Sequence, residues 1–489
     1  MRRMASADEL FAEGNRLLNN RQIAEAIHCY ELAIAQQPQF PEALCNLATA
    51  LAESGRHEEA LRWYDMAIAL RPNFPNVHFN RSNSLAALNR MGEALASVER
   101  ALALDPQFVE AWSNRGVLLR KMGHVPEAFE CHRRAMQLRP DSSPVHSNIG
   151  LCYGSLGRAE QAIDHYDRAL QLQSDNVGAR CNRAQQYLLK ADFRRGWPEY
   201  ESRWQLERAK LPDRGLPRWD GSSLQGRTIL LRHEQGFGDT IMCCRFAPLV
   251  KARGGRTVVE CPKRLHRLMQ TCDGIDAMID TDEPVDDLSC EAPILSLPGI
   301  FETSLRTIPK TIPYLSAELE RIEKWRDRLP KEGMRIGIAW QGNPDYPEDA
   351  MRSIPLRHFA PLASMPGVTL VSLQMGKGVE QIAPLRERLP FVELGPSLDA
   401  DGAFVDTAAV IMNLDLIVTS DTAIVHLAGA LGRPVWLALT IGPEWRWLRD
   451  RDDSPWYPTA RLFRQESYGD WDGVFARIRE AVAQFRAER

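Results

Sequence analysis

The sequence has few cysteines and no long apolar run, and each absence excludes a class of protein. Ten cysteines in 489 residues are too sparse for a disulfide-stabilised scaffold, and none falls in a C-x-x-C pair, although Cys243 and Cys244 are adjacent. Zinc ribbons and thioredoxin-like redox sites are therefore excluded. No apolar run approaches the roughly 18 residues of a membrane span, and the first residues turn polar and acidic where a signal peptide is apolar. We expect a soluble, cytoplasmic protein in a reducing compartment.

The chain also lacks a large excess of charge of either sign. Sixty lysines and arginines face 64 aspartates and glutamates, so the net charge is -4. No global basic field draws such a chain to nucleic acid or to anionic lipid. With 44% hydrophobic, 25% charged and 8% aromatic residues, the composition is that of a globular protein. At roughly 100 to 200 residues per domain, the length predicts two to four domains.

A 34-residue repeat organises the first two fifths of the chain. Two series of alanines keep one phase, prolines end successive units, and glycines recur in the turn inside a unit. Small residues let two helices approach closely, glycine permits the tight turn, and proline stops the second helix. The pattern predicts a helix-turn-helix solenoid and resembles the tetratricopeptide repeat. The repeated positions are Ala26, Ala60, Ala94, Ala128 and Ala162; Ala33, Ala67, Ala101, Ala135 and Ala169; Pro38, Pro72, Pro106 and Pro140; and Gly55, Gly123 and Gly157.

A sixth unit begins near Val177 and departs from the pattern. Gly196 stands where the alanine belongs, and Ser174 replaces the fifth proline. A solenoid needs such an atypical terminal unit as a cap or as a joint to the next domain. We therefore predict a solenoid of about six units over residues 1–206. The stretch LPDRGLPRWDGSSLQG, rich in Pro, Gly and Ser, then predicts a linker over residues 207–226.

Strand and helix signals alternate after this linker and restart near Met334. Such alternation predicts parallel sheets covered by helices on both faces. We expect two Rossmann-like domains, an acceptor-side domain over residues 227–332 and a donor-side domain over residues 333–489. The strands are expected at Thr228–His233, Thr257–Cys261, near Ala277, near Ile294, and at Arg335–Trp340, Thr369–Leu373, Leu416–Thr419 and Val435–Leu439; the helices are expected at Asp239–Arg253, Leu265–Thr271, Leu356–Ala363, Val405–Asn413 and Thr422–Leu431.

Ligands of such sheets bind beyond the carboxyl ends of the strands. The chemistry is therefore expected in three loops, at Glu234–Asp239, Gln341–Arg352 and Ser420–Asp421. In the first loop, EQGFGDT, Gly236 and Gly238 permit the close approach of a ligand. No complete G-x-G-x-x-G follows, so a dinucleotide site is poorly supported. Asp239 can also be read as a helix cap, and both interpretations stay open here.

The second motif runs from Thr419 to Leu439. A strand ends at Ser420, and Asp421 and Thr422 begin a helix whose first-turn N–H groups and positive dipole end can hold a diphosphate. Ala423 keeps this helix close to its neighbours. His426 lies one turn into the helix, where the alternative interpretation is an imidazole that only packs between helices.

In this order and spacing, the two motifs resemble the bacterial heptosyltransferase-like glycosyltransferases, which have a GT-B fold of two Rossmann-like domains. The resemblance covers roughly residues 226–489. In that family a Gly-Asp pair carries the acceptor-side base, which matches Gly238 and Asp239. A D-[ST]-x-x-x-H-L-A stretch holds the sugar nucleotide. It matches Asp421, Thr422, His426, Leu427 and Ala428.

The whole chain is similar to bacterial tetratricopeptide proteins with a glycosyltransferase domain. These proteins carry EQGxGDT, an RSIPL segment, a W-R-W and a W-Y-P, which stand here at Glu234–Thr240, Arg352–Leu356, Trp445–Trp447 and Trp456–Pro458. Flagellin glycosyltransferases and, more distantly, O-GlcNAc transferases share the plan of repeat arm and GT-B module. The fold class implied is an α-solenoid followed by an α/β GT-B fold.

The resemblance implies a metal-independent, inverting transfer of a sugar from a nucleotide donor to a protein Ser or Thr hydroxyl. Asp239 is the candidate base, because the hydroxyl is a weak nucleophile until its proton is taken. The helix start at Asp421–Ala423 and the cation of Arg352 are the candidates for stabilising the leaving phosphate, beside Gln341. No cofactor is expected beyond the nucleotide sugar. The alternative is an inactive GT-B module on a protein-binding repeat scaffold.

Two further sequence features have less informative interpretations. Asp280-Thr281-Asp282 reads as the D-x-D metal motif of a different glycosyltransferase fold, and in this acidic stretch we interpret it as a solvated loop. The dense aromatic cluster of the W-R-W and W-Y-P segments either plugs the space between domains or lines an acceptor groove.

Asparagines also recur every 34 residues, one on the first helix of each unit from the second to the sixth. First helices line the concave face of a tetratricopeptide superhelix, and an amide can pair with the backbone of an extended peptide. The O-GlcNAc transferases use such a ladder to hold substrate segments. We therefore expect a protein acceptor on the arm, although the amides can instead bond between neighbouring helices. The ladder consists of Asn46, Asn80, Asn114, Asn148 and Asn182.

Overall fold

A computed structural model describes residues 5–206, 211–281, 283–346, 348–386 and 391–488. The chain divides into two compact units, residues 1–152 and residues 153–489. The division falls inside one helix of the repeats, α9 (Ser143–Ser155). The predicted division into solenoid, linker and two Rossmann-like domains stays a prediction, and the predicted linker begins with residues 207–210, which lie outside the described residues.

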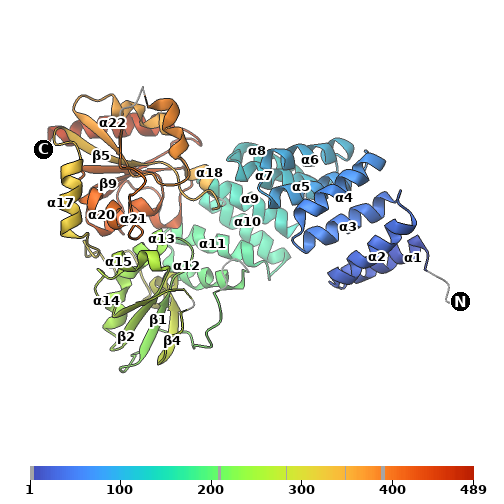
Figure 1. The fold of residues 1–489 in the computed structure, drawn as a ribbon, viewed down its shortest axis with the longest axis horizontal. Helices are drawn as coiled ribbons and strands as arrows, with labels where there is room; N and C mark the ends of the chain where they lie inside the picture. Colours follow the sequence, from blue (N-terminus) through green and yellow to red (C-terminus); the bar gives the residue numbers. More distant parts are fainter. Residues whose placement is uncertain (1–4, 207–210, 282, 347, 387–390, 489) are drawn as a thin grey trace. The chain divides into compact units, whose positions relative to one another are not determined.

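The first unit is built from helix hairpins. Figure 1 shows its successive helices side by side in the order of the sequence. The two alanine series lie fully buried between the helices, as the 34-residue register predicts, and each second helix ends two residues before the proline of its unit. Its helices are α1 (Ala7–Asn19), α2 (Ile23–Gln36), α3 (Pro41–Glu53), α4 (His57–Leu70), α5 (Pro75–Ala87), α6 (Met91–Leu104), α7 (Val109–Lys121) and α8 (Val125–Leu138).

The turn inside each unit explains the recurrent glycines. Gly55, Gly123 and Gly157 have φ values of 83°, 84° and 72°, a left-handed conformation that costs glycine nothing. Asn89 occupies the same repeat position with φ 59°, and asparagine is among the residues that tolerate this conformation. The repeat therefore extends through the unit that lacks the glycine.

The second unit begins with the last repeat helices. These are α10 (Ala159–Leu172), α11 (Val177–Leu189) and α12 (Phe193–Tyr200), followed by the 3-10 turn η1 (Glu201–Gln205). A Cβ on Gly196 would overlap Cδ2 of the buried Leu188, so α12 packs against α11 too closely for the usual alanine. The sixth unit is thus present as a shortened hairpin.

A four-stranded parallel sheet follows, in the order β3-β2-β1-β4. Part of the predicted linker pairs with its edge, because the N–H of Glu291 donates to Pro217 and the N–H of Trp219 donates back to Glu291. Its strands are β1 (Thr228–Arg232), β2 (Arg256–Glu260), β3 (Ala277–Ile279) and β4 (Leu288–Pro293); its helical segments are α13 (Phe237–Cys243), η3 (Cys244–Phe246), α14 (Ala247–Lys251), η4 (Lys263–Leu265), α15 (His266–Met269), η5 (Ile294–Ser296) and α16 (Leu297–Ile300).

The second sheet has six parallel strands in the order β10-β9-β8-β5-β6-β7. Figure 1 shows α22 on one side of it and α20 and α21 on the other, and each face has its own apolar core. Its strands are β5 (Met334–Ala339), β6 (Val368–Ser372), β7 (Phe391–Glu393), β8 (Leu416–Thr419), β9 (Val435–Leu439) and β10 (Ala460–Arg464); its helical segments are α17 (Leu319–Arg328), α18 (Asp349–Arg352), η6 (Leu356–Phe359), α19 (Ala360–Ala363), η7 (Val379–Gln381), η8 (Ala383–Leu385), α20 (Val405–Met412), α21 (Ala423–Ala430), η9 (Trp445–Trp447) and α22 (Trp471–Ala487).

Two predicted elements need correction. The strand expected near Ile294 is β4, which ends at Pro293. The single helix expected over Asp239–Arg253 is broken into α13, η3 and α14, and the helix expected over Leu356–Ala363 is broken into η6 and α19. Pro248 and Pro361 stand in the first turns of α14 and α19, where the missing N–H is tolerated, and a longer helix would put them in its interior.

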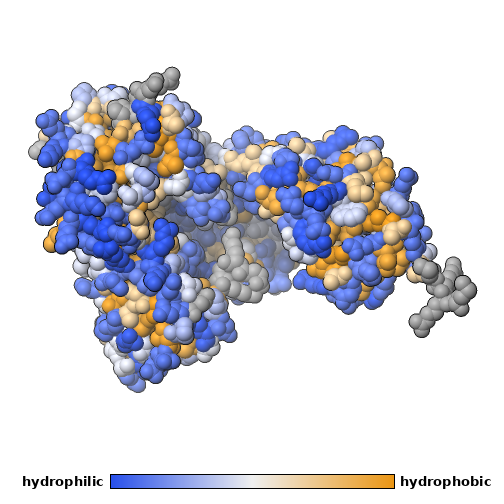
Figure 2. All heavy atoms as spheres, in the orientation of Figure 1, coloured by the Kyte–Doolittle hydropathy of each residue, from blue (hydrophilic) through white to orange (hydrophobic). Residues whose placement is uncertain are grey.

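Figure 2 shows hydrophilic residues over most of the face in view, interrupted by scattered hydrophobic ones on both units. Among the described helices, none is both long and apolar enough to cross a membrane. The exposed large hydrophobic residues are Leu32, Met66, Leu70, Leu249, Leu305, Leu319, Met375 and Val379.

Candidate functional site

The loop after β1 carries the predicted base into a close contact between the two sheets. The N–H of Gly236 donates to Oδ2 of Asp239 at 2.9 Å, which caps the start of α13. A Cβ on Gly238 would lie 2.8 Å from the ring of His426 on α21. This glycine therefore permits the approach of another helix of the protein, whereas its place in the motif predicts the approach of a ligand.

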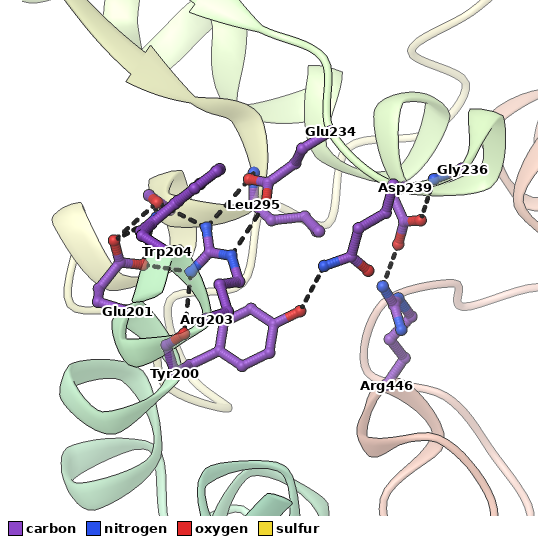
Figure 3. A network of polar contacts seen from close by, with 11 residues as sticks. Tyr200, Glu201, Arg203, Trp204, Glu234, Gly236, Asp239, Leu295 and Arg446 are labelled. Atoms are coloured by element: carbon purple, nitrogen blue, oxygen red, sulfur yellow. Dashed lines mark hydrogen bonds and ion pairs between the residues drawn. The ribbon is translucent and has the colours of Figure 1, made fainter. Parts of the chain in front are cut away.

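Asp239 has a second partner that links the two sheets. Its Oδ1 forms an ion pair with Nη2 of Arg446, from the 3-10 turn η9 that follows β9 (Figure 3). The Asp239 side chain is only 15% exposed. Both oxygens of the predicted base are thus engaged by donors, one by the helix cap and one by the guanidinium.

Arg446 lies inside a small network of charges. Its Nη1 lies 3.5 Å from Oε2 of Glu444, and the hydroxyl of Tyr346 donates to Oε1 of Glu444 at 2.6 Å. Burial alone would lower the pKa of Arg446, but the carboxylates of Asp239 and Glu444 raise it above its ordinary value. The guanidinium therefore stays charged in the interior because carboxylates face it.

The start of α21 is buried and faces two arginines. Asp421 is 7% exposed, and burial raises its pKa to about 6, although the charge of Arg352 and, more weakly, that of Arg446 oppose the rise. Ser420 and Thr422 flank this carboxyl, and Ala423 opens the helix. The Ser420 hydroxyl is fully buried and finds no hydrogen-bond partner within the described part of the chain. An unpartnered buried hydroxyl calls for an explanation, and a bound ligand is one.

The loop after β5 brings Arg352 to this place but holds Gln341 differently. Arg352 donates from Nε to Asp349 at 3.1 Å, and its guanidinium lies over the ring of Tyr346. Burial lowers its pKa, but Asp421 and Asp349 raise it to a net value above the ordinary one. Gln341 instead has its amide oxygen 3.3 Å from Nε2 of Gln381 and its backbone bonded to Gln374. None of these contacts of Gln341 reaches Asp421.

His426 is a packed imidazole. Its ring stacks on Trp447 with centroids 5.5 Å apart, and its Nδ1 lies 2.9 Å from the hydroxyl of Tyr457. Burial, and then the charge of Arg446, hold its pKa well below the ordinary value, so the ring is neutral. These contacts are those of the packing interpretation, and a direct role of His426 at a donor stays a prediction.

The aromatic cluster is interior. Trp445, Trp447, Trp456 and Tyr457 are each at most 2% exposed. Trp445 meets Trp197 of α12 edge to face, with ring centroids 5.3 Å apart. The cluster therefore fills the space between the last repeat helices and the strand-end loops, as the plug interpretation has it.

The last repeat also contacts the loop that carries Asp239 through a buried ion pair. Arg203 of η1 and Glu234 are 4% exposed, and they pair through two N–H donors at 2.9 and 3.0 Å (Figure 3). Glu234 also accepts from the N–H of Leu295, and Gln235 donates to the hydroxyl of Tyr200 at 3.3 Å. Buried Glu234 is thus a structural anchor for the loop.

The asparagines of the repeats bond between neighbouring first helices. The amide nitrogens of Asn46, Asn80 and Asn114 donate to the residue 31 positions earlier, and that of Asn148 donates to Ser113 at 3.1 Å. These are the contacts of the inter-helix alternative. Asn182 is half-buried on α11. Peptide binding by the ladder stays a prediction, because each amide uses only part of its capacity in these bonds.

Asp280 of the D-x-D motif forms hydrogen bonds with nearby backbone groups. Oδ1 of Asp280 accepts from the N–H groups of Lys263 and Thr281, and Asp282 lies outside the described residues. Asp280, which follows the end of β3, also lines an open surface hollow of about 600 Å³ with Lys263 and His266, which follow the end of β2. Within the described ranges, no three or more His, Cys, Asp and Glu side chains are grouped to hold a metal ion.

Four residues of the site were missed as functional candidates. Arg446 pairs with Asp239, Glu444 lies beside Arg446 and accepts from the hydroxyl of Tyr346, and Arg203 pairs with Glu234. Arg446 had a visible signal, a charge between two tryptophans in the W-R-W. The pairing with Asp239, 207 positions earlier, had none.

Comparisons with known proteins support the repeat part of the chain. The tetratricopeptide repeat family matches residues 11–75, 75–108 and 107–175. Residues 11–175 therefore consist of tetratricopeptide repeats, and this part of the chain is a protein-interaction scaffold.

Individual relatives cover only parts of the chain. Protein FlbA of Caulobacter vibrioides is 30% identical over 319 residues, which are 60% of this chain and 52% of FlbA, so the chain spans about half the length of this relative. The crystal structure of a thermophilic TPR protein from Thermus thermophilus is 23% identical, with a TM-score of 0.34 over 37% of this chain and 97% of that one. YrrB, a TPR protein with an unusual peptide-binding site, is 20% identical, with a TM-score of 0.30 over 36% and 90%.

Proposed function

We propose that the chain is a glycosyltransferase that moves a sugar from a nucleotide-sugar donor to a Ser or Thr hydroxyl of a flagellin-like protein. Its two parallel sheets are compatible with a GT-B fold, and the reaction is metal-independent and inverting. The observation that carries the proposal is the gathering of Asp239, Arg446, Asp421 and Arg352 from loops after four parallel strands. Ligands of doubly wound sheets bind at that edge.

The donor phosphates lie at the start of α21. The first-turn N–H groups and the positive end of this helix favour an anion, and Arg352 and Arg446 add two cations. Fixed donors and cations stabilise the charge that develops on the leaving nucleotide phosphate. The Ser420 hydroxyl is free among the described groups to donate to a phosphate oxygen.

The acceptor reacts at Asp239. One carboxylate oxygen takes the proton of the acceptor hydroxyl while the hydroxyl oxygen attacks the anomeric carbon. The bond from that carbon to the phosphate oxygen breaks, and its electron pair leaves with the nucleotide. A single displacement of this kind inverts the anomeric centre. The products are the glycosylated protein, the nucleotide and a protonated Asp239.

The repeats hold the protein acceptor. Their first helices carry the asparagines, whose amide oxygens and remaining N–H groups can pair with an extended backbone. The reaction takes place in the cytoplasm, with no nucleic acid or membrane span involved. No cofactor takes part beyond the nucleotide sugar.

The test is transfer by the full chain from a panel of UDP-, GDP-, ADP- and CMP-sugars to a flagellin-type protein, read as added mass. We expect one donor to be used in the presence of EDTA. Arg352→Ala should weaken binding of that donor in calorimetry by about tenfold, because a charge-assisted phosphate contact is lost. Asp421→Ala should weaken it as well, because the carboxylate holds the Arg352 cation at this place. Arg357→Ala, at an exposed arginine of the same domain, is the matched control. Unchanged affinity in both site variants would show that the donor binds at another site.

An inactive module on the scaffold is the second candidate. The observation that favours it is the engagement of both Asp239 oxygens by protein donors. A scaffold of this kind would bind its protein partner but turn over no nucleotide sugar. Binding of the acceptor without transfer from any donor of the panel would decide for it.

A further inference from the structure

Arg446 makes fewer contacts than a buried guanidinium can. Its side chain is 9% exposed, and it contacts Asp239 through Nη2 and Glu444 through Nη1 at 3.5 Å. Its Nε is buried and has no hydrogen-bond partner in the part of the chain that the structure describes. A guanidinium has five N–H donors in a planar fork that matches two phosphate oxygens. Arg446 therefore has capacity for an anion that the protein does not fill.

A second donor without a hydrogen-bond partner among the described residues lies at the end of β8. The Ser420 hydroxyl is fully buried at the end of β8 and has no partner among the described groups. Trp447, the neighbour of Arg446, stacks on His426 of α21, and Gly238, the neighbour of Asp239, lies against Ala423 at the start of that helix. Two buried donors without a partner, from different loops, thus border the start of α21.

The present partner of Arg446 is the group that the proposed reaction needs. Asp239 can accept the acceptor proton only through an oxygen that is accessible. Oδ1 is paired with Arg446, Oδ2 accepts from the N–H of Gly236, and the side chain is only 15% exposed. The same guanidinium therefore covers the base and lies beside the phosphate position.

We propose that Arg446 exchanges partners, pairing with Asp239 in the free protein and with donor phosphate oxygens in the complex, so that donor binding uncovers the base. This inference rests on the proposed function and adds to it the order in which the donor binds and the base becomes available. The nucleotide sugar binds first, and only then can Asp239 accept a proton. Without a donor, the carboxylate is held by Arg446 and cannot activate a hydroxyl or water.

The exchange predicts opposite effects of the two partners on nucleotide affinity. The probes are UDP, GDP, ADP and CMP, and the nucleotide that the parent chain binds is then titrated into the variants by calorimetry. Arg446→Gln should weaken binding at least tenfold, because a phosphate contact is lost. Asp239→Asn should tighten binding about three- to tenfold, because the competitor for Arg446 is gone. Asp450→Asn removes a surface carboxylate and should leave the affinity unchanged.

A double variant separates the exchange from simple charge repulsion. If Asp239 acts through Arg446, Asp239→Asn should have no effect in the Arg446→Gln background. If the carboxylate only repels the phosphates, the same tightening should persist there. Thermal melting shows whether Arg446→Gln folds. If it does not, Arg446→Lys takes its place in the cycle, because lysine keeps the charge and loses the planar pair of N–H donors.

The outcomes also distinguish this inference from the proposed function. A parent chain that binds none of the four nucleotides contradicts both. A parent chain that binds one of them, with equal affinity in Asp239→Asn or with the tightening retained in the double variant, overturns the exchange and leaves the glycosyltransferase proposal standing.

Discussion

Ion pairs in the repeats and ion pairs near the strand-end loops differ in burial. In the repeats, Arg56 and Glu59 pair across one helix turn with side chains 49% and 47% exposed. Near the loops, Arg203 pairs with Glu234 and both are 4% exposed. Water and salt screen the first kind, whereas removing one partner of the second leaves a charge in the interior.

This difference indicates what stabilises each region. The repeats bury two series of alanines and the apolar residues around them, so their charges can vary at little cost. The loops of the second unit are fixed by a few charges, each with a named partner. Substitutions in the two regions should therefore differ in their effects.

The largest effect on stability is expected from Arg203→Met. Glu234 would be left buried without its cation, which costs about 3–5 kcal/mol. Denaturant unfolding followed by tryptophan fluorescence measures the loss. Adding Glu234→Gln, which keeps an acceptor for the N–H of Leu295, should recover much of it. A single variant as stable as the parent would contradict the account of this pair.

Asp421→Asn should stabilise the free protein at pH 8 and have little effect near pH 4. Burial raises the pKa of Asp421 from 3.8 to about 6, so the folded state binds the proton more tightly than the unfolded state does. Stability therefore falls as pH rises through this window, by roughly 3 kcal/mol at most. Thermal melting across pH compares the two chains. A difference that does not change with pH would contradict the burial of an ionised carboxylate.

Gly196→Ala should destabilise the chain by about 1–3 kcal/mol. The added Cβ would overlap the side chain of Leu188, and overpacking a filled interior has this cost. The other repeats carry alanine at the same position, so the substitution restores the repeat pattern and should still be unfavourable. An unchanged unfolding midpoint would show that Leu188 can move aside.

The smallest effect is expected from Arg56→Ala, which removes the exposed pair with Glu59. The unfolding midpoint should stay within its experimental error, since exposed pairs contribute little. This variant is the matched control for Arg203→Met. A loss as large as that of the buried pair would remove the distinction between the two regions.

The sequence predicts elements best where local pattern determines them. The 34-residue register places the helix hairpins, because buried alanines and left-handed turns recur with it. Four strands of the second sheet, β5, β6, β8 and β9, are found within about a residue, whereas β7 and β10 were not predicted. Helix α22 was not predicted, although its apolar residues Trp471, Val474, Phe475 and Ile478 have helical spacing. The helix breaks near Pro248 and Pro361 could also have been predicted, because proline disfavours a helix interior.

The candidate site could be predicted only in part. The carboxylates Asp239 and Asp421 stand in recognisable strand-end loops, so their place follows from topology. The partner of Asp239 does not, because Arg446 reaches it through tertiary packing. Gly238 was assigned to a ligand by its type, and only the packing of α13 against α21 gives its observed neighbour, His426.

The most direct test of the central claim is the turnover of Asp239→Asn with the donor that the parent chain uses. The amide keeps the size of the side chain and cannot take the acceptor proton. We predict that transfer falls by about 10² or more, the scale of general-base loss, with folding retained and nucleotide binding not weakened. Near-normal transfer by this variant would contradict the account and leave Asp239 as the cap of α13.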